Sequence, residues 1–236
     1  IRDVAVTGVQ TCALPISDDV SIDSLAKDTF GFSGAQLESV ANEAAIMAMR
    51  EGSERIEARH FRGAIEKVMM GEKLDRLPSK EEKYRIAVHE SGHALMGELK
   101  LPGSVASINV ASRSNALGYV RQTQEDDIYL YTYDYLKSRI AVALAGAAAE
   151  ELILGSKSTG GSNDFKQAAD MAKQIVYSGM SELGIISIED LPGNELHSEI
   201  SKILHQSEKE TKELLKQHIE KLKQITDLVL ERETLS

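Results

Sequence analysis

The sequence predicts a mainly α-helical protein with a small β element, and its composition is the first indication. Aromatic residues make up 5% of the 236 positions, and the chain has 4 prolines and no tryptophan. Alanine, leucine, glutamate and lysine are frequent, and these are strong helix formers. Apolar residues also recur at helical spacing over several long segments, whereas only two short runs are typical of strands.

Charge and cysteine content exclude several classes of protein. The net charge is −10, which leaves no generally basic surface for a phosphate backbone, so we expect no nucleic-acid partner. No apolar run approaches the ~20 residues of a membrane-spanning helix. The single cysteine, Cys12, permits neither an intrachain disulfide nor a thiolate metal cluster.

Residues 1–16 are expected to be a non-native leader, because 6–16 resemble the translation of a sequencing-adapter oligonucleotide. The alternative for this segment is a native β-strand that enters the domain.

Residues 17–71 are predicted to form a small helical unit. Ser33 precedes a helix whose apolar residues, beginning with Leu37, continue at helical spacing to Arg50. A second helix is expected from Glu57 to Met70, and Gly71 ends it. The charged segment that follows contains Pro78 and is taken as the boundary to a second domain, residues 79–236.

The second domain is predicted to begin with a helix from Ser79 to Leu99, because Ser79 and Glu82 have the spacing of a capping box. Two β-prone runs, 105–110 and 117–122, indicate a hairpin or a small sheet.

An alanine-rich helix is expected over 132–154, with Gly155 as its stop. After the tight loop 158–163, a further helix runs from Asn163 or Asp164 to Tyr177. From Glu195 onward, an apolar stripe predicts one or two long amphipathic helices.

His89, Glu90 and His93 form a His-Glu-x-x-His motif inside the first of these helices. At positions i and i+4 the two imidazoles lie on one helix face, close enough to share a zinc ion. Glu90 lies about 100° around the helix, where it can reach a metal-bound water without being a ligand. Two packed core histidines beside a surface glutamate are the alternative.

A catalytic zinc needs a third protein ligand, and three downstream carboxylates are candidates: Glu150, Glu151 and Asp164. Glu150 and Glu151 are adjacent in a helix, so both cannot face one site. Asp164 lies where a glycine-rich loop meets a helix N-terminus, which favours a carboxylate. A plain helix cap explains Asp164 equally well on these grounds, and the choice stays open here.

Three motifs in this order resemble the peptidase domain of the FtsH family of membrane-anchored, ATP-dependent zinc metalloproteases. They are His-Glu-Ser-Gly-His at 89–93, Ala-Glu-Glu-Leu at 149–152 and Ser-Thr-Gly-Gly-Ser-Asn-Asp at 158–164. Upstream, 31–37 and 42–45 resemble the helical lid of that family's AAA ATPase module. The resemblance implies a helical zinc peptidase domain preceded by part of an AAA lid.

Carried over to this sequence, the resemblance makes His89, His93 and Asp164 ligands of Zn²⁺, and Glu90 the general base. It places Glu150 close to the metal, as a residue that orients a ligand. The chain departs from the family pattern at Ser91, at Ser178-Gly179 and at Ala111-Ser112-Arg113. The last two departures put substrate preference in doubt.

The resemblance also implies a function: an endopeptidase that acts on unfolded or membrane-associated polypeptides, coupled to an AAA ATPase. Family members assemble as hexamers on the cytoplasmic side of the bacterial inner membrane. No Gly-x-x-x-x-Gly-Lys-Ser/Thr motif occurs in this sequence, so we expect a soluble fragment without the ATPase motor. The alternatives are a non-catalytic ring-assembly subunit and a standalone small-peptide metallohydrolase.

Overall fold

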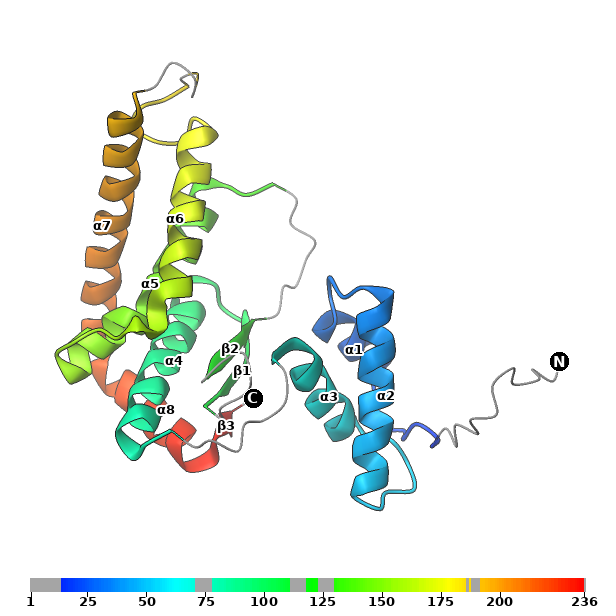
Figure 1. Cartoon of the computed structure of the whole chain (residues 1–236). Helices are drawn as coiled ribbons and strands as arrows, with labels where there is room; N and C mark the ends of the chain where they lie inside the picture. Colours follow the sequence, from blue (N-terminus) through cyan, green and yellow to red (C-terminus); the bar gives the residue numbers. More distant parts are fainter. Residues whose placement is uncertain are drawn as a thin grey trace. The chain divides into compact units, whose positions relative to one another are not determined.

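The computed structural model describes residues 14–70, 78–110, 118–122, 130–185, 187 and 192–235. The chain divides into two compact units, one N-terminal to Lys73 and one C-terminal to it. Both are mainly helical, and the second also holds a small sheet (Figure 1). The predicted fold class is therefore confirmed.

The N-terminal unit contains α1 (Ile22–Asp28), α2 (Gly34–Arg50) and α3 (Ala58–Met70). The hydroxyl of Ser33 accepts the backbone N–H of Gln36, whose side chain accepts the N–H of Ser33, and this reciprocal cap fixes the start of α2. The apolar faces of α2 and α3 enclose a core of Val40, Ala44, Ala48, Ile56, Phe61, Ala64 and Ile65. The short helix α1 was not predicted.

The predicted leader falls partly outside the described residues, which begin at Leu14. Leu14 packs against the core of the N-terminal unit, and Ile16 forms a parallel bridge with Ile56. The N–H of Ile56 donates to the carbonyl of Pro15 at 2.9 Å. That residues 1–16 are a leader stays a prediction.

The described residues of the C-terminal unit form five long helices, a short 3₁₀ turn and three strands. In chain order these are α4 (Lys80–Lys100), β1 (Val105–Asn109), β2 (Tyr119–Gln122), α5 (Tyr133–Leu154), η1 (Thr159–Gly161), α6 (Ser162–Tyr177), α7 (Gly193–Gln217), α8 (Ile219–Arg232) and β3 (Thr234–Leu235). The predicted caps of α4 and α5 are present: Ser79 and Glu82 form a capping box, and Gly155 ends α5 in the left-handed conformation.

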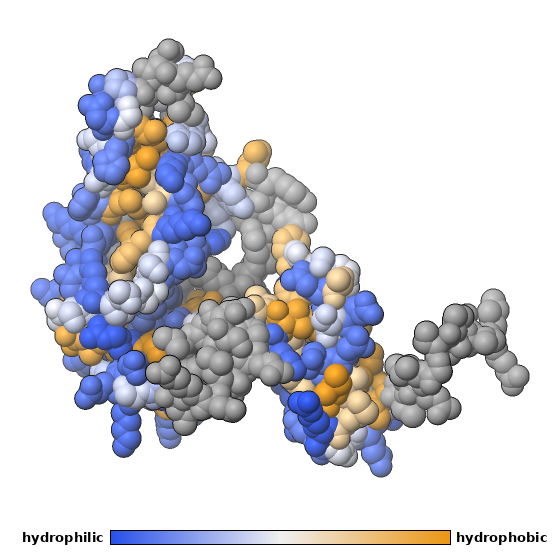
Figure 2. Space-filling model, in the orientation of Figure 1, coloured by the Kyte–Doolittle hydropathy of each residue, from blue (hydrophilic) through white to orange (hydrophobic). Residues whose placement is uncertain are grey.

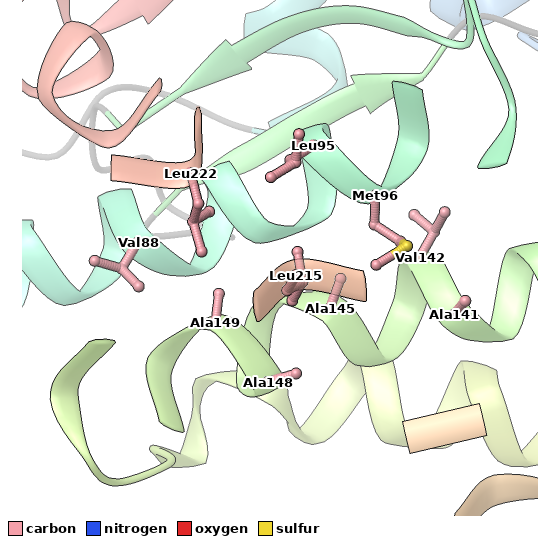
Figure 3. Packing of buried hydrophobic residues seen from close by; sticks show 10 residues of the cluster. All are labelled: Val88, Leu95, Met96, Ala141, Val142, Ala145, Ala148, Ala149, Leu215 and Leu222. Atoms are coloured by element: carbon pink, nitrogen blue, oxygen red, sulfur yellow. The ribbon is translucent and has the colours of Figure 1, made fainter. Parts of the chain in front are cut away.

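Helices α4 and α5 pack unusually closely, because small residues line their contact. A Cβ on Gly92 would lie 2.6 Å from the carbonyl oxygen of Ala145 and 2.7 Å from the Cβ of Ala149. Figure 3 shows the resulting core, which contains Val88, Leu95 and Met96 of α4 and four alanines of α5. Leu215 of α7 and Leu222 of α8 complete it.

Helices α6 and α7 form a layer that covers the other side of α5. They run side by side, and apolar residues lie along the line where they meet (Figure 2). Ala168, Ala172 and Ile175 of α6 are fully buried there, and Ile203 of α7 is 8% exposed. This layer holds α6 against α5, and so fixes the position of the N-terminus of α6.

The sheet is antiparallel, with strand order β2-β1-β3. Strands β1 and β2 are the predicted pair; the turn expected at 111–115 lies outside the described residues. Ile108 and Val110 pack against Ala87 and Ala94 of α4, so the sheet lies on the helix that carries the histidines. Among the described residues, no helix is long and apolar enough to cross a membrane.

Candidate functional site

The structure brings His89, His93 and Asp164 together. Both histidines lie on α4, and Asp164 lies in the first turn of α6. The two Nε2 atoms are 3.0 Å apart, and Oδ2 of Asp164 is 3.3 Å from Nε2 of His89 and 3.5 Å from Nε2 of His93. One potential ligand atom from each residue therefore faces a common point, and within the described ranges no other group of three such side chains does.

Two local features make room for this cluster. Helix α5 passes close to the Nε2 atoms of both imidazoles at Gly146, where a Cβ would lie 2.5 Å from Nε2 of His89 and 2.6 Å from Nε2 of His93. The turn η1 then leads into α6 and places Asp164 at a helix N-terminus, where the helix dipole favours a carboxylate. The sequence predicted that the glycine-rich loop leads to Asp164 at a helix N-terminus, but the contribution of Gly146 was not predicted.

Hydrogen bonds on the far side of each ring determine which atoms face the cluster. Nδ1 of His93 lies 2.7 Å from the carbonyl oxygen of Val142, and Nδ1 of His89 lies 2.7 Å from Oε1 of Glu150. Both partners can only accept, so each Nδ1 must carry a proton, and in the neutral rings each Nε2 presents a lone pair. Two lone pairs 3.0 Å apart beside a carboxylate require a positive charge between them, so the donor set fits a metal cation.

Without a metal, the positive charge at this point is a proton. Burial lowers the pKa of His89, but hydrogen bonds to Asp164 and Glu150 and the charge of Glu90 outweigh it and raise that pKa to about 9. Burial raises the pKa of Asp164, but hydrogen bonds from both histidines hold it well below its ordinary value. The site is therefore electrostatically suited to one cation.

Glu90 lies beside the cluster and is 8% exposed. Burial raises the pKa of its carboxyl, and the two histidines oppose that effect. Gly118, the residue just before β2, lies close to Glu90, since a Cβ there would be 3.1 Å from Oε1 of Glu90. Glu90 is thus close to both the histidines and the outer strand of the sheet.

The two adjacent glutamates of α5 point in different directions, as their spacing requires. Glu150 is fully buried and holds Nδ1 of His89. Glu151 instead pairs with Lys212 of α7 at 2.9 Å and with Lys157 at 3.3 Å. Glu150 is therefore behind His89 rather than in the cluster, and Glu151 is outside the site.

Two of the three departures from the family pattern lie in the described residues, and one of them, Ser91, is next to Glu90 in α4. It is fully buried in α4, and its hydroxyl has no hydrogen-bond partner within the described part of the chain. Ser178-Gly179 forms the end of α6, with Gly179 in the left-handed conformation. Residues 111–113 lie outside the described residues.

Comparison with known families gives matches to both units. The sequence model of peptidase family M41 matches residues 76–236, and that of the AAA+ lid domain matches residues 19–63. The chain is 38% identical over 250 residues to the ATP-dependent zinc metalloprotease FtsH of Syntrophotalea carbinolica, covering 96% of this chain and 38% of that protein.

Two further relatives have similar names. FtsH 2 of Salinibacter ruber is 37% identical over 94% of this chain and 36% of its own length. FtsH of Thermobaculum terrenum is 43% identical over 75% of this chain and 28% of its own length. The chain thus spans less than half the length of these curated relatives.

Proposed function

Because the chain belongs to the FtsH family, peptidase family M41, we propose that it is a zinc-dependent endopeptidase of the His-Glu-x-x-His type. Its substrates are unfolded or membrane-associated polypeptides. The observation that carries the proposal is the convergence of two Nε2 lone pairs and one carboxylate oxygen beside a buried glutamate. That donor set suits zinc, and the neighbouring carboxylate provides the base that peptide hydrolysis needs.

In this mechanism His89, His93 and Asp164 hold the metal. When bound, zinc would polarise the scissile carbonyl and increase the acidity of a water molecule. Glu90 takes a proton from the attacking water and delivers it to the leaving amine nitrogen. Glu150 keeps the proton of His89 on Nδ1, so that Nε2 stays available as a ligand atom.

The outer edge of β2 is the proposed binding site for the substrate backbone. Strand β2 lies at the end of the sheet order and pairs with β1 on one side. An extended substrate can add to such an edge through main-chain hydrogen bonds, and binding of this kind would accept many substrate sequences. Gly118 carries this strand past Glu90, so a substrate aligned along β2 would have its backbone near the reacting groups.

The proposal extends to the full-length protein, in which the peptidase domain would be coupled to an ATPase and assembled as an oligomer. We take residues 17–71 as an AAA lid-like subdomain and residues 79–236 as the peptidase domain, which the family matches over 19–63 and 76–236 support. Relatives are named ATP-dependent, and in the full-length protein an ATPase would deliver substrate to this site. The protein would act as a hexamer on the cytoplasmic side of the bacterial inner membrane.

Zinc content and casein cleavage test the proposal. We expect one zinc per chain by elemental analysis and cleavage of casein by the wild type. Glu90→Gln should retain the zinc and lose activity by several orders of magnitude, because an amide of nearly the same shape cannot accept the proton. Zinc retention with undiminished cleavage would exclude Glu90 as the base; zinc retention without cleavage by the wild type would favour a ring-assembly subunit.

A further inference from the structure

Arg85 is a charged residue of α4 that sequence reasoning did not connect with the site. It lies one helical turn before His89. Its Nη1 donates to Oε2 of Glu150 at 2.7 Å and to the carbonyl oxygen of Ser156 at 2.8 Å, and Nη2 donates to the hydroxyl of Ser156 at 3.3 Å. Arg85 therefore contacts α5 and the segment that leads to α6.

Glu150 needs such a partner because its side chain is only 1% exposed. A buried carboxylate is costly unless it is paired and hydrogen-bonded. Nδ1 of His89 and the hydroxyl of Ser158 occupy its Oε1, at 2.7 and 3.0 Å, and Arg85 occupies its Oε2. Once His89 is a neutral metal ligand, Arg85 is the full positive charge in contact with this carboxylate.

The same contacts join both ligand-bearing segments, α4 with the two histidines and the loop that leads to Asp164. Through Glu150, Arg85 acts on His89; through Ser156, it holds the segment before η1, which leads to Asp164. Ser158 adds a second link, since its hydroxyl donates to Glu150 and accepts the N–H of Gly160. Loss of Arg85 would leave the carboxylate of Glu150 without its charge partner and the loop without two hydrogen bonds.

We propose that Arg85 is a positioning residue of the zinc site, which holds the carboxylate of Glu150 in place so that His89 presents Nε2 to the metal. The proposal rests on the proposed zinc function. Partners that support a metal-binding histidine in this way typically contribute 10–100-fold to metal affinity.

The test measures the zinc dissociation constant of the full chain by competition with a chromophoric chelator. Arg85→Met keeps the aliphatic stem and should weaken zinc binding about 10–100-fold. Arg85→Lys keeps the positive charge but has fewer hydrogen-bond donors, so its zinc affinity should lie between those of the wild type and Arg85→Met. Arg139→Met is the matched control, because Arg139 of α5 contacts Tyr135 and should leave zinc affinity unchanged. Circular dichroism checks that each variant is folded.

A double mutant separates positioning from general packing. Glu150→Gln removes the buried charge that Arg85 contacts. Adding Arg85→Met to Glu150→Gln should therefore change zinc affinity by less than about twofold, much less than Arg85→Met changes it in the wild-type background. Wild-type affinity in folded Arg85→Met, or fully additive losses in the double mutant, would overturn the proposal. A wild type that binds zinc but cleaves no peptide refutes only the peptidase function; one that binds no zinc refutes both.

Discussion

Replacing Gly146 by alanine should empty the metal site while leaving the fold in place. Gly146 is a buried residue of α5 that lies next to the Nε2 atoms of the two histidine rings. The added methyl would lie 2.5 Å from Nε2 and 2.6 Å from Cδ2 of His89, and 2.6 Å from Nε2 of His93. It would therefore occupy the space next to both ligand nitrogens.

The distances determine the size of the effect. Carbon atoms in contact prefer separations of about 3.5–4.0 Å, so the rings would have to retreat by about 1 Å. Metal sites tolerate deviations of only about 0.2 Å in ligand distance. We expect zinc affinity to fall by more than 100-fold, beyond the 10–100-fold typical of a lost supporting hydrogen bond. Overpacking should also cost about 1–3 kcal/mol of stability.

The assay combines chelator competition with thermal unfolding of the zinc-free protein. Gly193→Ala is the matched control, because a Cβ at this first residue of α7 meets nothing within 4 Å. The control should retain both zinc affinity and melting temperature. Wild-type zinc affinity in Gly146→Ala would refute the reasoning, because the metal could then not lie between these two Nε2 atoms.

Two further predictions concern stability. Ser91→Ala should raise the free energy of unfolding by about 1 kcal/mol in urea titrations, because it removes a buried hydroxyl without a partner among the described residues; a loss of stability would show that this hydroxyl is satisfied. The zinc-free protein should be most stable between about pH 4 and 6.5 in thermal melts with chelator. His89 has a raised pKa, so its contribution is complete below 6.5 and is lost as pH rises through about 9. Asp164 has a lowered pKa, so its contribution is present above 3.8 and is lost on acidification. A melting temperature that falls neither above pH 6.5 nor below pH 3.8 would contradict both shifts.

The elements that could be predicted from the sequence are those with local signals. Reciprocal caps at Ser33 and Ser79 and the stop at Gly155 set helix boundaries within one or two residues. Strand β3 could not be predicted, because its two residues are held by pairing with β1, over 120 positions earlier in the chain. Leu37 was assigned to the apolar face of α2 but is 45% exposed, since spacing does not determine how far a face is covered.

In the candidate site, too, some residues could be predicted from local sequence signals and others depend on tertiary packing. His89, Glu90 and His93 follow from spacing on one helix, whereas the choice between Asp164 and the two glutamates depends on how α6 packs against α5. Residue order alone could not make that choice without the family resemblance. Arg85 was missed, although its position four residues before His89 places it on the same helix face.

The close contact between α4 and α5 has a consequence for how this metal site could be altered. His89 is hydrogen-bonded to Glu150 of α5 and His93 to Val142 of α5, so both imidazoles are held by a helix pair whose contact at Gly92 has no room for a Cβ. Asp164 lies on a different helix, α6, which follows a short loop. Two ligands thus share one helix, whereas the third lies on a separate helix that follows this loop. Engineering for a metal of another radius or coordination number should therefore vary the loop at 156–163 and leave the helix pair intact.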